Sequence, residues 1–230
     1  MGPFRRAEAI AVLIVAITFL VASPSIVTPG VAPGVARGAP AGAIMGDGVI
    51  VAFGDSLTAG LGVAPDEAYP ARLEERLRRE GYPYRVVNAG VSGDTTAGAL
   101  RRVDWVLRAH PDVVIVALGA NDGLRGQSVA AMRGNLEAIV ARLKKAGARV
   151  LLTGMRLPPN YGDAYAREFA AAYPAVAQRT GALLAPFLLE DVAAVARLNQ
   201  PDAIHPNAEG QRVIADRLWP YLVPLLRRTG

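Results

Sequence analysis

Cysteine is absent from all 230 residues of the chain. This absence excludes disulfide bonds, zinc sites with cysteine ligands and a lipid anchor on an N-terminal cysteine. Histidine is nearly as scarce, because the sequence contains only His110 and His205. Any chemistry that needs an imidazole base therefore has two candidates.

The sequence also lacks clusters of one charge. It has 25 basic and 20 acidic residues, a formal net charge of +5, and the arginines are scattered over segments with helical periodicity. Such scatter is typical of solvated helix faces and differs from the basic patch of a nucleic-acid-binding protein. We therefore expect no nucleic-acid partner.

No strongly apolar run reaches the roughly 20 residues that a membrane-spanning helix needs. The most apolar run, Ala9–Ala22, follows Arg5 and Arg6 and precedes a stretch rich in proline, glycine and small residues. This order predicts a secretory signal peptide. We assign residues 1–43 to the signal peptide and a flexible linker.

Two cleavage points fit the small-residue pattern: Ala41-Gly42-Ala43 and, more weakly, Val21-Ala22-Ser23. The alternative to cleavage is an uncleaved N-terminal membrane anchor. We expect an exported protein, periplasmic or secreted, that keeps no stable membrane span in its mature chain and is a monomer.

Residues 44–230 predict one α/β domain in which short apolar strands alternate with amphipathic helices. The strongest strand, Asp112–Leu118, contains a continuous β-branched run, which suits a parallel strand covered on both faces. With right-handed crossovers, this order predicts a three-layer α/β/α sandwich. The other predicted strands are Gly48–Phe53, Arg85–Asn88, Arg149–Thr153 and Ala182–Ala185. The predicted helices are Tyr69–Glu80, one that the turn Ala89–Thr96 opens and that runs to about Ala109, Ser128–Lys145, Ala164–Arg179 with a kink or split at Pro174, Asp191–Arg197 and a last helix from the cap Asn207 to Leu226.

Polar side chains follow several of these strands. Asp55 and Ser56 come directly after the first strand, at the edge of a parallel sheet where ligands bind. Ser56 is therefore a candidate nucleophile, although it could also simply cap a loop or helix. Similar clusters are Ser92-Gly93-Asp94, Gly119-Ala120-Asn121-Asp122 and, before the last helix, Asp202-Ala203-Ile204-His205.

A serine hydroxyl needs a base to accept its proton. His205 lies in a loop that returns to the same edge, whereas His110 precedes a strand and belongs to the opposite edge. Asp202, three residues before His205, can orient the imidazole through its Nδ1–H. The competing role for Asp202 is helix capping, for which Asn207 is better placed.

An ester carbonyl that is attacked by serine develops a negative charge that needs hydrogen-bond donors. The backbone N–H groups of Ser56 and Gly93 and the side-chain amide of Asn121 are candidate donors. Each cluster alone is an ordinary turn, but four clusters at matching strand ends favour a catalytic site.

The four clusters, in this order, resemble the four sequence blocks of the GDSL, or SGNH, hydrolases. The resemblance covers about residues 49–226, and within the family the chain is similar to the bacterial periplasmic thioesterase I / protease I / lysophospholipase L1 (arylesterase) group. One departure is Ala203, where that group commonly has glycine. The shared motifs are Gly54-Asp55-Ser56-Leu57, Ser92-Gly93-Asp94-Thr95-Thr96, Asn121-Asp122-Gly123-Leu124-Arg125-Gly126, Arg156-Leu157-Pro158-Pro159-Asn160-Tyr161-Gly162 and Asp202-Ala203-Ile204-His205-Pro206-Asn207.

The resemblance implies a flavodoxin-like five-stranded parallel sheet of order 2-1-3-4-5. It implies Ser56 as nucleophile, His205 as base and Asp202 as the residue that orients the base. Ser56, Gly93 and Asn121 would form the oxyanion hole. It further implies no metal or cofactor and hydrolysis of small-molecule esters or thioesters, including aryl esters, acyl-CoA and lysophospholipids, through an acyl-enzyme.

Four side chains are predicted to bind the acyl group: Leu124, Leu157, Pro158 and Ile204. They follow strands at the same edge as Ser56 or lie between the two triad partners, and they offer apolar surface. The alternatives are a carbohydrate O-deacetylase and a catalytically inactive ligand-binding module on the same fold.

Overall fold

The computed structural model describes residues 48–227, apart from the side chain of Pro159. The predicted signal peptide and linker, residues 1–43, lie outside the described residues.

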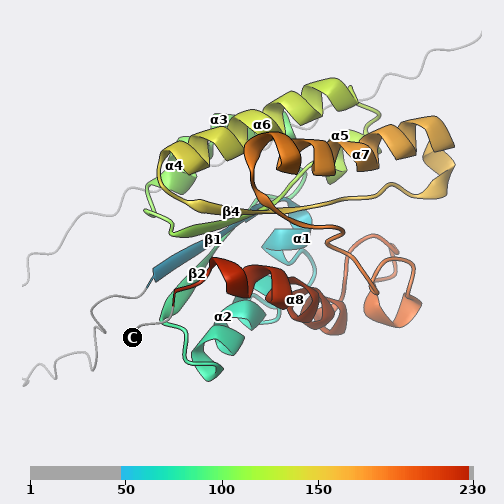
Figure 1. Cartoon of the computed structure of the whole chain (residues 1–230). Helices are drawn as coiled ribbons and strands as arrows, with labels where there is room; N and C mark the ends of the chain where they lie inside the picture. Colours follow the sequence, from blue (N-terminus) through green and yellow to red (C-terminus); the bar gives the residue numbers. More distant parts are fainter. Residues whose placement is uncertain (1–47, 228–230) are drawn as a thin grey trace, which may run out of the picture. The chain divides into compact units, whose positions relative to one another are not determined.

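Five parallel strands form one sheet in the order β2-β1-β3-β4-β5 (Figure 1). The predicted α/β class and strand order are therefore confirmed. The side chains of β3 are all buried, as expected for a strand that has neighbours on both sides and helices on both faces. The strands are β1 Gly48–Gly54, β2 Tyr84–Gly90, β3 Val113–Ala117, β4 Arg149–Thr153 and β5 Leu183–Ala185.

The register of β1 brings three strand ends together. Gly54, the last residue of β1, pairs with Gly90 at the end of β2 and with Ala117 at the end of β3. The segments that follow these residues therefore leave the sheet at one edge and at one level. This edge carries three of the four polar clusters that the sequence singles out.

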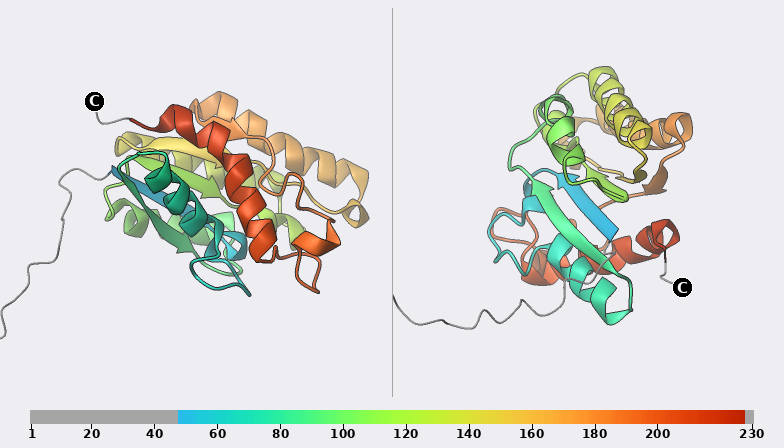
Figure 2. Two further views of the ribbon diagram at one scale, coloured as in Figure 1. Left: turned by 90° about the horizontal axis from the view of Figure 1, so that it is seen from below. Right: turned by 90° about the vertical axis from the view of Figure 1, so that its left-hand side faces the viewer.

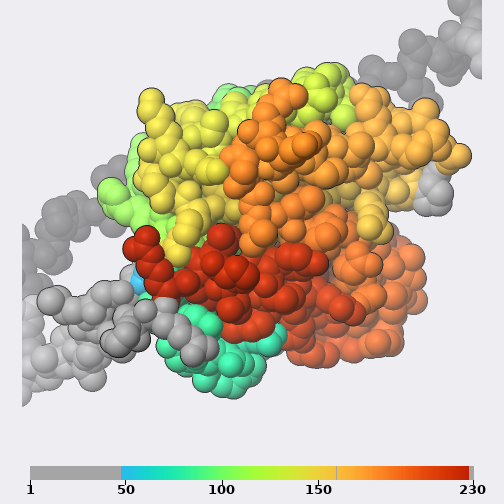
Figure 3. Space-filling view, in the orientation of Figure 1, coloured from blue at the N-terminus to red at the C-terminus, as the bar shows by residue number. Residues whose placement is uncertain are grey.

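Helices cover both faces of the sheet (Figures 1 and 2). One layer contains α3 to α7 and the other contains α1, α2 and α8. Figure 2 shows α2 beside α8, and Figure 3 shows α8 in red between α2 and the orange segment that contains α7. The helices are α1 Ser56–Ala59, α2 Tyr69–Arg79, α3 Thr96–Arg101, α4 Val103–Leu107, α5 Ala120–Leu124, α6 Val129–Lys145, α7 Asp163–Thr180 and α8 Ala208–Leu222, with short 3₁₀ turns η1 Pro159–Tyr161, η2 Ala196–Leu198 and η3 Val223–Leu225.

The helix predicted up to Ala109 is divided in two. Arg102 has φ −106° and ψ 10°, outside the helical range, and it separates α3 from α4. Its guanidinium is bound to carbonyls at the ends of β1 and β2. The residue at which the helix is interrupted is therefore also the residue whose side chain is bound to the sheet.

The short helix predicted at Asp191–Arg197 is wrong. Asp191 and Ala194 have φ values of 60° and 61°, in the left-handed region, so a continuous right-handed helix cannot form there. The segment instead makes turns that end in η2. The Asn199 side chain closes them by donating to the carbonyls of Val192 and Val195.

A break at Pro174 is also absent, because α7 continues through this residue from Asp163 to Thr180. Buried side chains on both sides of the proline, Phe169 and Val176, pack into the core. Tyr173 adds a hydrogen bond from its hydroxyl to the Leu118 carbonyl at 3.1 Å. Tertiary packing thus holds both halves of the helix in place despite the lost backbone N–H.

Two glycines offer a matched test of how closely β2 approaches α1. A Cβ on Gly90 would lie 2.2 Å from the backbone nitrogen of Ala59, whereas a Cβ on Gly134 in α6 meets no atom within 4 Å. We expect Gly90→Ala to lower the free energy of unfolding by about 1–3 kcal/mol through overpacking. Gly134→Ala should raise it by about 0.5–1 kcal/mol, because alanine loses less entropy in a helix. Urea unfolding of both variants measures the difference, and equal effects would contradict the close approach.

Candidate active site

The turn that carries Ser56 is built by Asp55. Asp55 precedes α1, and its carboxylate Oδ1 accepts a hydrogen bond from the Leu57 N–H at 3.0 Å. Ser56 is thereby the first residue of α1, where backbone N–H groups have no partner inside the helix. Its side chain is largely buried at the edge where β1 ends.

Ser56, His205 and Asp202 form a continuous chain of hydrogen bonds. The Ser56 Oγ lies 3.0 Å from His205 Nε2, and His205 Nδ1 lies 2.7 Å from Asp202 Oδ2. A carboxylate on Nδ1–H keeps the other ring nitrogen free to accept a proton from the serine. The structure therefore brings together the three residues that the sequence pointed to, from the two ends of the domain.

Asp202 is held ionised by its neighbours. Its Oδ1 accepts hydrogen bonds from the backbone N–H groups of Ile204 at 2.9 Å and His205 at 3.0 Å. The bond from the His205 N–H, followed by the bond to the imidazole and then that from Ile204, lowers the pKa of Asp202 to about 2. The carboxylate is thus available to orient His205 and to stabilise an imidazolium at neutral pH.

The loop between Asp202 and His205 is a tight turn closed by Gln200. The Gln200 carbonyl accepts from the Ala203 N–H at 2.9 Å, and the Gln200 N–H donates to the His205 carbonyl at 2.8 Å. Ala203 itself has φ 58°, in the left-handed region. Glycine adopts this conformation without strain, which gives a physical reason for a glycine at this position in similar proteins.

The three candidate oxyanion donors come from neighbouring segments. Gly93 has φ 79°, a conformation that favours glycine, and within residues 48–227 its N–H has no hydrogen-bond acceptor. The Asn121 Nδ2 donates to the Asp94 carbonyl at 3.0 Å and to Asp55 Oδ2 at 3.3 Å. The Asn121 amide therefore lies between the residue before Ser56 and the residue after Gly93. The longer bond is the weaker one, so its hydrogen is the one that a substrate oxygen can take over.

Asp55 has a role at this site that the sequence reasoning did not assign. Desolvation by burial raises its pKa to about 6, against the opposing hydrogen bond from Leu57 and the charge of His205. The same carboxylate caps α1 and accepts from the Asn121 amide. In the sequence, the position of Asp55 directly after a buried strand is the only sign of this role, and the chemistry of the turn is assigned to its neighbour Ser56.

Asp122 joins two of the segments next to the site through buried hydrogen bonds. Its buried carboxylate accepts from the Thr96 N–H at 2.8 Å and from the Thr96 hydroxyl at 2.6 Å, and so ties α5 to the start of α3. In the sequence, Asp122 with Asp202 and His205 could suggest a metal site. Within residues 48–227 the structure places no three such side chains together in a way that could hold a metal ion.

The predicted acyl-binding side chains fall into two groups. Leu157 packs against α5, since a Cβ on Gly123 would lie 2.7 Å from its Cδ2, and the Tyr161 hydroxyl donates to the Leu124 carbonyl at 3.1 Å. Pro158 and Ile204 are exposed, Ile204 by 50%. Leu124 in α5 and Leu157 in the loop after β4 therefore form one group, whereas Ile204 lies in the triad loop, between Asp202 and His205.

Two further exposed apolar side chains, Leu61 and Val91, also belong to this edge. They are 45% and 47% exposed, and they follow α1 and β2. The Gln200 Nε2 donates to the Leu61 carbonyl at 2.6 Å, which joins this loop to the triad loop. The sequence offered only weak signals for them, because Leu61 lies between two glycines and Val91 precedes a polar turn.

His110 does not take part in the site. It is exposed and lies between α4 and β3, at the edge of the sheet opposite to Ser56. Among the described residues no helix is long and apolar enough to cross a membrane.

The chain matches a known protein family and several curated proteins. Residues 52–213 match the model of the GDSL-like lipase/acylhydrolase family. The chain is 44% identical to esterase TesA of Pseudomonas aeruginosa over 178 residues, which cover 77% of this chain and 89% of TesA. It is 39% identical to thioesterase 1/protease 1/lysophospholipase L1 of Escherichia coli K12, over 77% of this chain and 84% of that protein.

Among solved structures, the psychrotrophic esterase EstA from a Pseudoalteromonas species, inhibited by monoethylphosphonate, superimposes with a TM-score of 0.74. It shares 36% identity over 77% of this chain and 98% of EstA. The family match covers well over half of the chain, and the relatives are aligned over most of their length. The chain therefore belongs to the GDSL-like lipase/acylhydrolase family.

Proposed function

We propose that this protein is a serine esterase and thioesterase that hydrolyses carboxylic esters and acyl thioesters through an acyl-enzyme on Ser56. The observation that carries the proposal is the hydrogen-bonded chain from Ser56 through His205 to Asp202. Relatives named esterase, arylesterase and thioesterase/lysophospholipase support the substrate class. Aryl esters, acyl-CoA and lysophospholipids are the proposed substrates, and no metal or cofactor takes part in the proposed reaction.

In the proposed reaction, the Ser56 Oγ attacks the carbonyl carbon while His205 Nε2 accepts its proton. The N–H groups of Ser56 and Gly93 and the amide of Asn121 stabilise the oxyanion. Collapse of the intermediate expels the alcohol or thiol, which takes the proton from His205. Water, deprotonated by the same imidazole, then attacks the acyl-serine, and the carboxylic acid leaves as Ser56 regains its proton.

The proposed roles predict which histidine matters. Ser56→Ala and His205→Ala should each lower kcat/KM for p-nitrophenyl butyrate by at least about 1,000-fold, because triad members act as a unit. Asp202→Asn should lower it by at least about 100-fold, since the imidazole then takes the wrong tautomer. His110→Ala removes the other histidine and should change it by less than about twofold, because His110 lies at the opposite edge.

Circular dichroism of each variant separates lost activity from lost folding. A folded Ser56→Ala variant with wild-type turnover, or equal losses for the two histidine variants, would contradict the assignment. A wild-type protein without any esterase activity would instead support the inactive ligand-binding alternative.

The apolar side chains at the site edge predict a preference for longer acyl groups. Each buried methylene contributes about 0.8 kcal/mol, so kcat/KM should rise from acetyl to octanoyl esters by up to about fourfold for each methylene that these side chains cover. Leu157→Ala and Ile204→Ala should flatten the rise. Leu183→Ala offers a control, because Leu183 is also exposed but begins β5 at the opposite edge.

A series of p-nitrophenyl esters and acyl-CoA thioesters on the purified protein measures this preference. A preference for acetyl esters that Leu157→Ala leaves unchanged would favour the alternative function, a carbohydrate O-deacetylase.

We also propose that a signal peptide within residues 1–43 directs export and is removed, and that residues 44–230 form a monomeric hydrolase domain. Arg5, Arg6 and the apolar run Ala9–Ala22 support this proposal. Native mass spectrometry of protein from its own host should find a single chain that begins between Ser23 and Ile44. An intact Met1 on cytoplasmic protein would contradict export, and a mass of two chains would contradict the monomer.

A further inference from the structure

Arg102 lies at the junction of α3 and α4 and turns its guanidinium toward the sheet. The Nε donates to Asp94 Oδ2 at 2.7 Å, the Nη1 to the Ala89 carbonyl at 2.8 Å and the Nη2 to the Gly54 carbonyl at 2.9 Å. The guanidinium carbon also lies 4.5 Å from the centre of the Phe53 ring. The Arg102 side chain is only 19% exposed and that of Asp94 only 10%. All three nitrogens of the guanidinium are therefore committed to contacts inside the protein.

The acceptors of Arg102 belong to the segments that carry two of the proposed oxyanion donors, Ser56 and Gly93. Gly54 is two residues before Ser56, and Asp94 directly follows Gly93. The backbone carbonyl of Asp94 in turn accepts from the Asn121 amide at 3.0 Å. Ala89 lies at the end of β2, the strand that leads into the Gly93 turn. The Arg102 side chain thus binds the segments of Ser56 and Gly93 directly and is linked to Asn121 through Asp94.

We propose that Arg102 is a positioning residue for the oxyanion hole, which holds the donors of Ser56, Gly93 and Asn121 at a fixed spacing. This inference rests on the proposed function. Oxyanion stabilisation depends on donors that are oriented before the charge develops, so a loose segment lowers the rate even when every donor is present. Arg102 touches no reacting atom and acts through the Gly54 and Ala89 carbonyls and the Asp94 carboxylate.

The geometry requires an arginine. A guanidinium offers five donors in one rigid plane and can reach three acceptors at once, whereas a lysine ammonium is a point charge on a flexible stem. Arg102→Lys can retain the ion pair with Asp94 but not the two carbonyl contacts together. The lysine variant therefore separates the charge of Arg102 from its bridging geometry.

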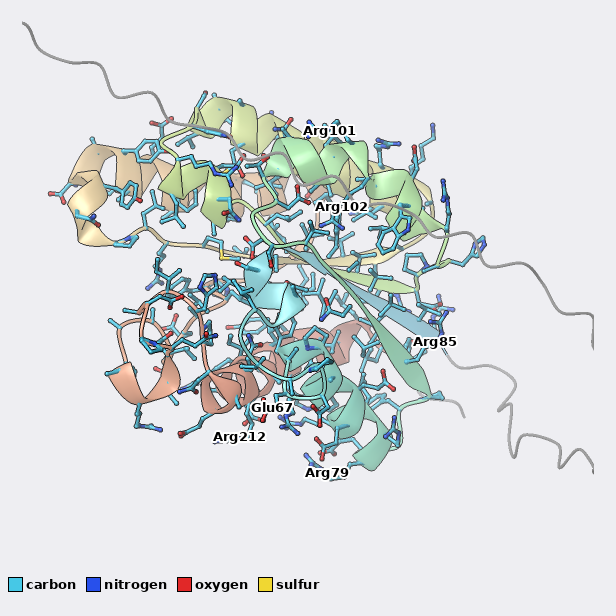
Figure 4. The ribbon with its side chains drawn as sticks, turned by 180° about the vertical axis from the view of Figure 1, so that it is seen from behind. Glu67, Arg79, Arg85, Arg101, Arg102 and Arg212 are labelled. Atoms are coloured by element: carbon cyan, nitrogen blue, oxygen red, sulfur yellow. The ribbon has the colours of Figure 1, made fainter. Side chains whose placement is uncertain are left out.

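Arg101 provides a matched control. It is the neighbouring residue, carries the same charge and is exposed on α3, whereas Arg102 lies closer to the sheet (Figure 4). Among residues 48–227 the Arg101 side chain makes no hydrogen bond or ion pair, so Arg101→Met and Arg101→Lys remove or alter one arginine of the same helix end without breaking such a contact.

The test measures kcat and KM with p-nitrophenyl butyrate together with the rate of inactivation by a p-nitrophenyl alkylphosphonate, whose adduct on serine carries the oxygen of a tetrahedral intermediate. We expect Arg102→Met to lower kcat by about 100-fold or more, comparable to the loss of one oxyanion donor, with KM changed less than about threefold. Phosphonate inactivation should slow by a similar factor. Arg102→Lys should lose at least about tenfold in kcat, and the Arg101 variants should match the wild type.

Asp94→Asn is a second, milder variant should Arg102→Met not fold. It retains the backbone carbonyl that Asn121 contacts but weakens the bond to the Arg102 Nε, and a smaller loss of kcat with unchanged KM is expected. Variants of Arg102 and Asp94 that have lower thermal stability but wild-type kcat and phosphonate reactivity would overturn the inference and leave Arg102 a purely structural residue. An inactive wild-type protein would instead overturn the proposed function, so the two failures are distinguishable.

Discussion

The pairing of β1 with β2 on one side and β3 on the other is the constraint on which the site depends. Parallel pairing in this register places Gly54, Gly90 and Ala117 at the same level of the sheet. The turns that follow these three residues therefore start next to one another at the same edge of the sheet. Ser56, the N–H of Gly93 and the side-chain amide of Asn121 can therefore lie close together, although Asn121 follows Ser56 by 65 residues in the sequence.

Buried polar contacts then fix the turns that the sheet brings together. Asp55 joins the start of α1 to Asn121, Asn121 joins that point to the Asp94 carbonyl, and Arg102 joins the Asp94 carboxylate back to the end of β1. Such a closed set of hydrogen bonds leaves few buried polar groups unpaired, which is the condition for a polar network to rigidify a site. Asp122 extends it to the first turn of α3.

The loop that carries Asp202 and His205 comes from the other end of the domain and is joined to these segments by hydrogen bonds. The Gln200 side chain donates both to the Leu61 carbonyl and to the Pro206 carbonyl, so it fastens the loop with His205 to the loop that follows Ser56. These contacts of Gln200 with both loops support the 3.0 Å distance between Ser56 Oγ and His205 Nε2. The exposed side chains of Leu61 and Ile204 lie on these two loops, and that of Val91 lies on the loop after β2, so apolar surface lies near the polar side chains.

The sequence by itself determined the alternation of strands and helices, because apolar runs and helical periodicity are local properties. It also determined that polar clusters follow the strands. It favoured His205 over His110 as the base, because the order of elements places the His205 loop at the same edge of the sheet as Ser56 and His110 at the opposite edge. The resemblance in its motifs predicted the strand order, which the structure confirms. Only the tertiary structure decided the break at Arg102, the continuous α7 through Pro174 and the turns at Asp191, since distant packing and side-chain anchors outweigh local propensity there. The contacts of Asp55 and Arg102 belong to the same class: a carboxylate or guanidinium reveals its acceptors and donors only when segments far apart in sequence are folded against it.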